Sequence, residues 1–175
     1  MLLPDSLFPS NLAALERHPA GAFMQRFSGG GTSATIQVNT PFPQGDLSMV
    51  LGTLCATVTV QRGTGNDDIE MIEVNLIDRN SSQQLITLAR RRANATPGAG
   101  GVRAEDEGRR SGFTFLANST GRISFQFPEL KGLIVPNLYN LQVVSLMAVG
   151  GAQLLSHNLQ VDLFAYAIPK GLLLR

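Results

Sequence analysis

The sequence predicts an all-β protein, and three observations carry this prediction. Segments between Ser33 and Ile168 alternate apolar and polar residues, which is the period of a strand with one buried face. About eight such segments are separated by Gly, Pro and Asn turns, which is typical of a β-sandwich or barrel. The clearest alternation runs from Leu155 to Leu163, where most odd positions are apolar and the even positions are polar.

Each alternating segment predicts one strand. The expected strands cover residues 33–39, 47–60, 69–78, 84–90, 113–115, 123–127, 138–149 and 155–168. The segment 47–60 is apolar on both faces, which predicts a central strand or one that another subunit covers. Gly52 is expected to bend this strand or to form a bulge in it. The strands carrying Phe113 and Phe125 are expected to pair as a hairpin around a turn at 118–121.

The first 31 residues differ from the rest. We expect residues 1–31 to form a short, partly helical N-terminal arm and residues 32–175 to form the body, in a single domain overall. Ser10 suits a helix N-cap, and residues 20–27 are expected to add a short turn. Gly29–Gly31 then breaks the chain. The alternative is a helix that packs over one end of the sandwich.

Residues 91–110 predict a long, exposed and mobile loop, because a connection of this length is unusual inside a compact domain. Arg90–Arg92 and Arg109–Arg110 flank the acidic stretch 105–107, so the segment is close to neutral. No aromatic residue lies among these arginines to stack on bases. A solvated or subunit-bridging charge cluster is therefore preferred to a nucleic-acid site. The leucines at 172–174 are expected to dock on the body or on a neighbour.

The composition favours a protein that is covered by neighbours. Charged residues make up 15% of the 175 residues, against about 25% in typical globular domains. The net charge of +1 gives no argument for binding nucleic acid or anionic lipid. The start of the sequence lacks a signal-peptide pattern, and no run approaches the ~18 apolar residues of a membrane span. The low charge favours burial against other subunits.

The residues that carry enzyme chemistry are few and scattered. His157 lies in the apolar register of its strand and is expected to be a buried, hydrogen-bonded structural residue. His18 is expected to be exposed, and Cys55 is expected to be a small buried apolar residue. Asp162 is expected on the face opposite His157. We therefore expect no enzyme activity, no catalytic, cofactor-binding or metal-binding residue, and no cofactor.

The order of the segments, with an arm, about eight strands and one long loop, resembles a single jelly roll. The size, the 12 Arg against 2 Lys, the low charge and the Gly/Ala/Pro-rich loop resemble the smaller major capsid protein of tailless, membrane-containing Thermus bacteriophages. This resemblance covers most of the chain and involves no diagnostic motif. It implies a single eight-stranded jelly-roll β-sandwich, thermophily and dimerisation. It also implies contact with a larger capsid partner and proximity to an internal viral membrane.

The first functional hypothesis is therefore a structural capsid protein that self-associates and tiles with a partner to build an icosahedral shell. Such a protein would reside in the virion, be assembled in the host cytoplasm and bind no nucleic acid. The alternative is a ligand- or sugar-binding jelly-roll module, such as a spike or tail component, with its site near Tyr139 or Tyr166. A cupin-like enzyme is the third hypothesis.

Overall fold

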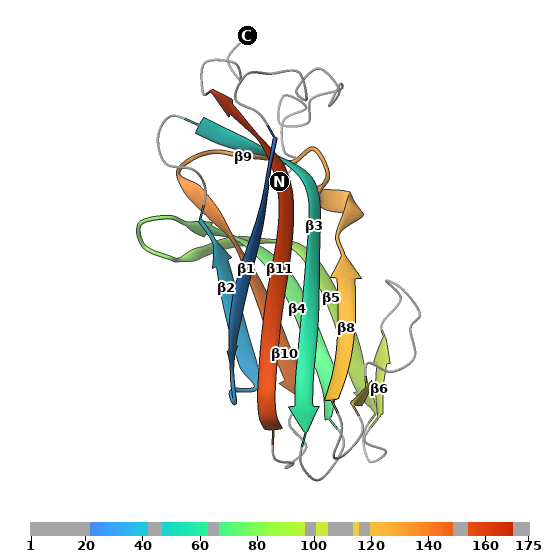
Figure 1. Ribbon diagram of the computed structural model, residues 1–175. Coiled ribbons are helices and arrows are strands. Elements are labelled where there is room, and N and C mark those ends of the chain that lie inside the picture. The colour runs from blue at the N-terminus through green and yellow to red at the C-terminus, as the bar shows by residue number, and fades with distance from the viewer. Residues whose placement is uncertain are drawn as a thin grey trace.

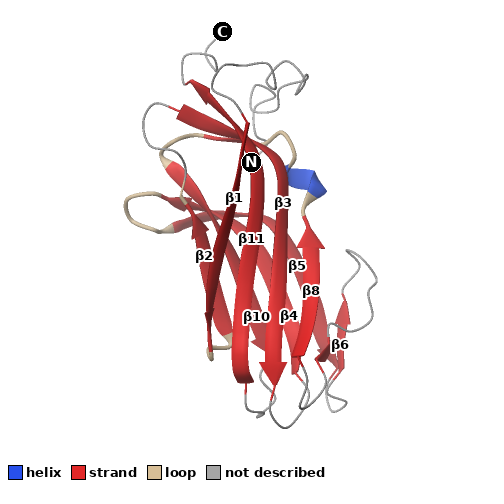
Figure 2. Cartoon of the chain, viewed as in Figure 1, coloured by secondary structure: helices blue, strands red, loops and turns tan. Residues whose placement is uncertain are grey.

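The alternating segments form two packed β-sheets in the computed structural model, which describes residues 22–41, 47–62, 67–96, 101–104, 114–115, 120–148 and 154–169. The strands are β1 (Ala22–Gly31), β2 (Thr35–Thr40), β3 (Leu47–Arg62), β4 (Asp67–Asp78), β5 (Gln84–Thr96), β6 (Gly101–Ala104), β7 (Thr114–Phe115), β8 (Thr120–Gln126), β9 (Ile134–Val135), β10 (Tyr139–Ala148) and β11 (Leu154–Pro169). A 3-10 turn, η2 (Pro128–Leu130), follows β8. Strands dominate the described chain (Figure 2).

The order of the strands is that of a jelly roll. The first sheet has the order β1-β11-β3-β8, with β9 paired to β3. The second sheet has the order β2-β10-β4-β5-β6, with β7 paired to β4. Figure 1 shows the first sheet in front of the second, and β1 beside β11 although they come from opposite ends of the described chain. The predicted all-β jelly roll is therefore confirmed, although β1 was not among the predicted strands and the predicted strand at 113–115 is only the two-residue β7.

The hydrophobic core lies between the two sheets. Val58 of β3 and Leu159 of β11 face it from the first sheet, and Val74 of β4 and Val143 of β10 face it from the second. All four side chains are completely buried. Burying one side chain of this kind contributes about 1.5–3 kcal/mol, so these layers hold the sheets together.

The pairing of β3 with β11 is the longest in the fold. Each strand has 16 residues, and the pairing extends from Leu47 opposite Pro169 to Arg62 opposite Leu154. β3 lies between β11 and β8, so the prediction that it is a central strand is correct.

The expected N-terminal turn is wrong where the structure describes it. Ala22–Gly31 is strand β1, and all ten of its residues pair with β11. The glycines at 29–31 continue this strand instead of breaking it, because β11 supplies a regular partner along their whole length. Residues 1–21, which include the expected helix and His18, lie outside the described residues.

The expected loop at 91–110 is also wrong in part. Strand β5 continues to Thr96, and Arg90–Arg92 pair with β4. Gly101–Ala104 then forms β6, which pairs with β5. Strand pairing overrides the polar composition that predicted a loop. Residues 97–100 and 105–110 lie outside the described residues, as do the leucines at 172–174.

The predicted hairpin does not form in the described residues. β7, which contains Phe115, pairs with β4 in the second sheet. β8, which contains Phe125, pairs with β3 in the first sheet. Alternation predicts which side chains share a face, but it does not identify the neighbouring strand. The chain crosses from one sheet to the other between β7 and β8, so these two strands do not pair although they are neighbours in the sequence.

The expected bulge at Gly52 is confirmed. Thr53 lies opposite Phe164 and Leu51 lies opposite Ala165, so Gly52 is the extra residue of β3. A Cβ atom at residue 52 would lie 2.9 Å from Cε1 of Phe164 and 3.1 Å from its carbonyl oxygen, and closer still to Cδ1. Only glycine lets the two strands approach this closely.

We predict that Gly52→Ala lowers the free energy of unfolding by about 1–3 kcal/mol, because the added methyl group overpacks against the Phe164 ring and backbone. Urea denaturation measures the change. Gly31→Ala is the matched control, because its Cβ would lie 3.8 Å from Cδ1 of Ile36, an ordinary contact. We expect that control to stay within about 0.5 kcal/mol of the unmodified protein. Equal losses for both variants would contradict this account of the bulge.

Candidate functional site

The surface that differs most from an ordinary exposed sheet is the side of the first sheet that points away from the core, here called the outer face. Its residues follow from the registers of β1, β11, β3 and β8. They are Arg26, Ser28, Gly30, Thr53, Cys55, Thr57, Thr59, Arg122, Ser124, Gln126, Asn158, Gln160 and Asp162. Hydroxyl and amide side chains predominate, where Lys and Glu are usual on solvated sheets.

The alternation in β11 produces this face as predicted. His157, Leu159, Val161 and Leu163 are buried, whereas Asn158 between them is exposed. Leu155 departs from the pattern and is 47% exposed, because the register shifts between Leu154 and Ser156.

Hydrogen bonds order the polar side chains along the outer face. The hydroxyl groups of Thr57 on β3 and Ser124 on β8 lie 2.9 Å apart. The Gln160 amide donates to Oδ2 of Asp162 at 2.7 Å, along β11. These bonds satisfy some of the donors and acceptors of the face and hold the four side chains that form them in place.

One ion pair crosses from β1 to β11 on this face. Nε of Arg26 donates to Oδ1 of Asp162 at 2.6 Å. Burial acts to raise the pKa of Asp162, but the hydrogen bonds from Arg26 and Gln160, together with the positive charges of Arg26 and Arg122, outweigh it, so the pKa lies below its ordinary value. The pair is largely solvated, so its contribution to stability is small.

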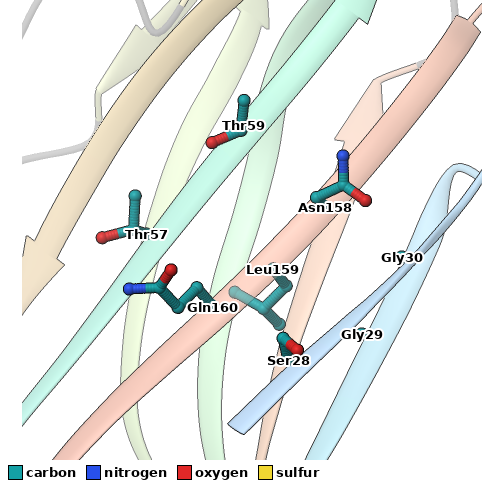
Figure 3. Close-up of a pocket in the computed structure, with 8 residues that line it drawn as sticks. All are labelled: Ser28, Gly29, Gly30, Thr57, Thr59, Asn158, Leu159 and Gln160. Atoms are coloured by element: carbon teal, nitrogen blue, oxygen red, sulfur yellow. The ribbon is translucent and has the colours of Figure 1, made fainter. Parts of the chain in front are cut away.

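A shallow, open depression of about 510 Å³ lies on the outer face between β1, β11 and β3. Figure 3 shows its lining, with Thr57 and Thr59 on β3, Asn158 and Gln160 on β11, and the glycines of β1. A Cβ atom at Gly30 would overlap Oδ1 of Asn158. Because Gly30 has no side chain, the Asn158 amide can occupy this space. The depression presents uncharged donors and acceptors.

The outer face becomes apolar toward one end of the sheet. Beyond Phe164 on β11, the side chains of Val50, Ile134, Tyr166 and Ile168 form a second buried cluster, separate from the main core. The double-sided apolar character of β3 is confined to this end. Tyr166 packs edge-on against Phe164 with ring centroids 5.1 Å apart.

His157 connects the two sheets inside the sandwich. Its Nδ1 lies 3.1 Å from the carbonyl oxygen of Ser33, so Nδ1 carries the proton and donates it. Nε2 then accepts from the hydroxyl of Ser145 on β10, at 2.9 Å. Burial lowers the pKa of His157, and the bond to Ser33 opposes this only partly. The predicted buried, hydrogen-bonded histidine is confirmed.

Cys55 is not the buried apolar residue that the sequence predicted. It lies partly exposed on the outer face, between Asp162 of β11 and Gln126 of β8. The apolar run around it suggested burial, but the bulge at Gly52 places residue 55 on the polar side. Asp162 does lie on the face opposite His157, as expected.

Arg90 and Arg91 of β5 form contacts within the fold. Nε of Arg90 pairs with Glu73 of the neighbouring strand β4. Nη2 of Arg91 lies 2.7 Å from Oε1 of Glu129 in η2, and its guanidinium lies 5.2 Å from the centre of the Phe127 ring. This contact joins the second sheet to the turn after β8. Arg109 and Arg110 lie outside the described residues.

The tyrosines do not provide an exposed platform. Tyr166 is 5% exposed and belongs to the second apolar cluster, and Tyr139 is half-buried against the main core. The expectation of a ligand site formed by exposed rings at these positions is therefore wrong. The described ranges contain no group of three or more His, Cys, Asp or Glu side chains placed to hold a metal ion.

The sequence did not single out the outer-face residues of β1, β3 and β8. In the sequence these residues, such as Thr57, Thr59 and Ser124, alternate with core residues. They can be assigned to the outer face only once the core residues are known. The part of the chain that the structure describes contains no helix with the length and apolar character of a membrane span.

Comparisons with known proteins do not assign this chain to a family. No family model matches the chain, and no curated protein matches it. A chain in the structure of the infectious bursal disease virus Gx strain is similar at 11% identity and a TM-score of 0.38. The match covers 86% of this chain and 33% of that chain, so this chain spans about a third of its length. A match this distant carries no argument, and the fold assignment rests on the strand order.

We predict that the protein loses stability as the pH falls below about 6.5, the ordinary pKa of histidine. The unfolded chain then binds a proton at residue 157 that the folded protein does not, because burial lowers the folded pKa. The free energy of unfolding should fall by up to about 1.4 kcal/mol per pH unit. Urea denaturation at pH 7.5, 6.5 and 5.5 measures it.

His157→Gln is the control for this prediction, because the amide keeps a donor and an acceptor but does not titrate. We expect this variant to be less stable at pH 7.5 and to show a smaller loss on acidification. The same pH slope in both proteins would show that another group is responsible.

Proposed function

We propose that this chain is a structural subunit of a viral capsid, which acts by self-association and by tiling with a second, larger capsid protein. The observation that carries the proposal is the outer face, a broad sheet surface on which hydroxyl and amide groups predominate and Arg26 is paired with Asp162. Desolvating hydroxyl and amide groups that find partners costs far less than desolvating Lys or Glu, so this face suits contact with another subunit.

The jelly roll supports this role because it is used in shells, although the fold by itself does not establish a function. Among the described large apolar residues, Met24 is 78% exposed and Leu138 is 59% exposed. Such residues add apolar area that neighbours can bury, at roughly 25 cal/mol per Å² before ordering costs are subtracted. This proposal also includes the larger partner, a location in the virion and assembly in the host cytoplasm. It further includes proximity to an internal membrane, a thermophilic phage as the source and the absence of enzyme activity.

We predict that the double variant Thr59→Lys/Ser124→Lys weakens assembly at least tenfold, because two ammonium groups must lose water when the outer face is covered. Light scattering of the full chain at micromolar concentration measures self-association. Light scattering also measures whether the full chain binds a capsid-like protein encoded next to the gene for this chain. Ser81→Lys/Gln83→Lys, at exposed positions between β4 and β5, is the control with equal added charge.

The control should assemble like the unmodified protein. The outer-face variant also loses the Ser124–Thr57 hydrogen bond and gains a positive charge opposite Arg122, and the control loses the Ser81–Asp78 hydrogen bond, so assembly is compared where far-UV circular dichroism shows both variants folded. A chain that stays strictly monomeric and binds no neighbouring shell protein would contradict the proposal.

The depression on the outer face favours a second candidate, a module that binds a neutral, hydroxyl-rich ligand such as a sugar. Thr59, Asn158 and Gln160 supply uncharged hydrogen-bonding groups there. A glycan array tests this candidate, and we expect Thr59→Lys to remove any signal. An array without hits would count against it.

A further inference from the structure

Strand β1 is an edge strand with a long, regular backbone. Its ten residues pair with β11 without a shift in register. No described strand pairs with its other side, because β1 ends the order of the first sheet. An edge strand of this kind exposes a row of N–H and C=O groups that can pair with another chain.

The edge of β1 lacks the usual features that prevent such pairing. Residues 22–31 contain no proline, no lysine and no bulge. Their single charged side chain, Arg26, is bonded to Asp162 within the same sheet. The edge strands β2 and β8 are shorter, with six and seven residues. The part of β5 that β6 leaves unpaired, residues 84–92, pairs irregularly with β4 and carries three arginines. β1 is therefore the described edge most open to another strand.

We propose that β1 pairs antiparallel with β1 of a second copy, around a two-fold axis at Gln25. In this register Gln25 lies opposite Gln25 of the second copy. Met24 lies opposite Arg26 of the second copy, and Phe23 lies opposite its Phe27. The inference deepens the proposed function and rests on it for the role of self-association. It assigns the edge and the register through which two subunits join.

The side chains of β1 favour this register over those with the axis at Arg26 or at Phe27. A two-fold axis at Arg26 would place two guanidinium groups opposite each other, which is repulsive. An axis at Phe27 would place Phe23 opposite Gly31 and leave its ring without a partner. The axis at Gln25 instead pairs aromatic rings on one face, where Phe23 and Phe27 are half-buried against the core.

The same register covers Met24 on the other face. Its side chain is 78% exposed, the most of the large apolar residues described. Opposite Arg26 of the second copy, it would pack against the methylene groups of that arginine while the guanidinium stays bonded to Asp162. The two first sheets then become one continuous sheet, and their outer faces form a single surface.

Charge variants at the two-fold axis test the proposal. We expect the unmodified protein to have the mass of a dimer by size exclusion with light scattering. Gln25→Lys alone and Gln25→Glu alone should each weaken the dimer at least tenfold, because like charges then face each other. An equimolar mixture of the two variants should restore it. Gln25 is exposed, so neither change disturbs the core. Gln37→Lys, on edge strand β2, is the matched control and should remain dimeric.

Cysteine crosslinking tests the register. In a Cys55→Ser background, Gln25→Cys should form a disulfide-linked dimer on mild oxidation, because position 25 faces itself. Met24→Cys should not, because it faces Arg26. Far-UV circular dichroism confirms that each variant is folded.

A dimer that Gln25→Lys leaves intact, or that Met24→Cys crosslinks in preference to Gln25→Cys, would overturn the inference. A monomer that still builds shells with a capsid partner would overturn the inference and leave the proposed function standing. A β1-linked dimer that joins no shell would count against the proposed function alone.

Discussion

The antiparallel pairing of β3 with β11 is the constraint on which the rest of the structure depends. It joins two 16-residue strands at the centre of the first sheet, and it sets which residues of each strand face the core. With Leu159 and Val161 inward, Asn158 and Gln160 must face outward. β1 takes its register from β11, and β8 takes its register from β3. A slip of one residue would place the amides in the core.

Gly52 makes this long pairing possible. By absorbing one extra residue, it places Cys55 and Thr57 on the polar side while Met49 and Leu51 remain buried at the other end of the strand. The same strand thus supplies both the polar outer face and the second apolar cluster. An assembly built on this face would therefore depend on a single backbone irregularity in β3.

The sequence predicted the properties that depend on local periodicity. The core positions of β11, the buried His157 and the bulge at Gly52 were all visible in the alternation and in a single glycine. The errors involve properties that depend on distant partners. Ala22–Gly31 became a strand because β11 pairs with it, and Phe115 and Phe125 went to different sheets because the chain crosses between them. The alternation showed the polar residues of β11, but it did not show that β1, β3 and β8 add residues to the same face, because only the register between strands brings these together.

The contact of Arg91 with Phe127 and Glu129 affects how the molecule carries load. It ties β5 of the second sheet to the turn after β8 of the first, while the short connection from β1 to β2 ties the sheets at the opposite edge. The sheets are thus connected by a side-chain contact near one edge and by the covalent chain at the other, so sliding one sheet past the other would break the Arg91 contact.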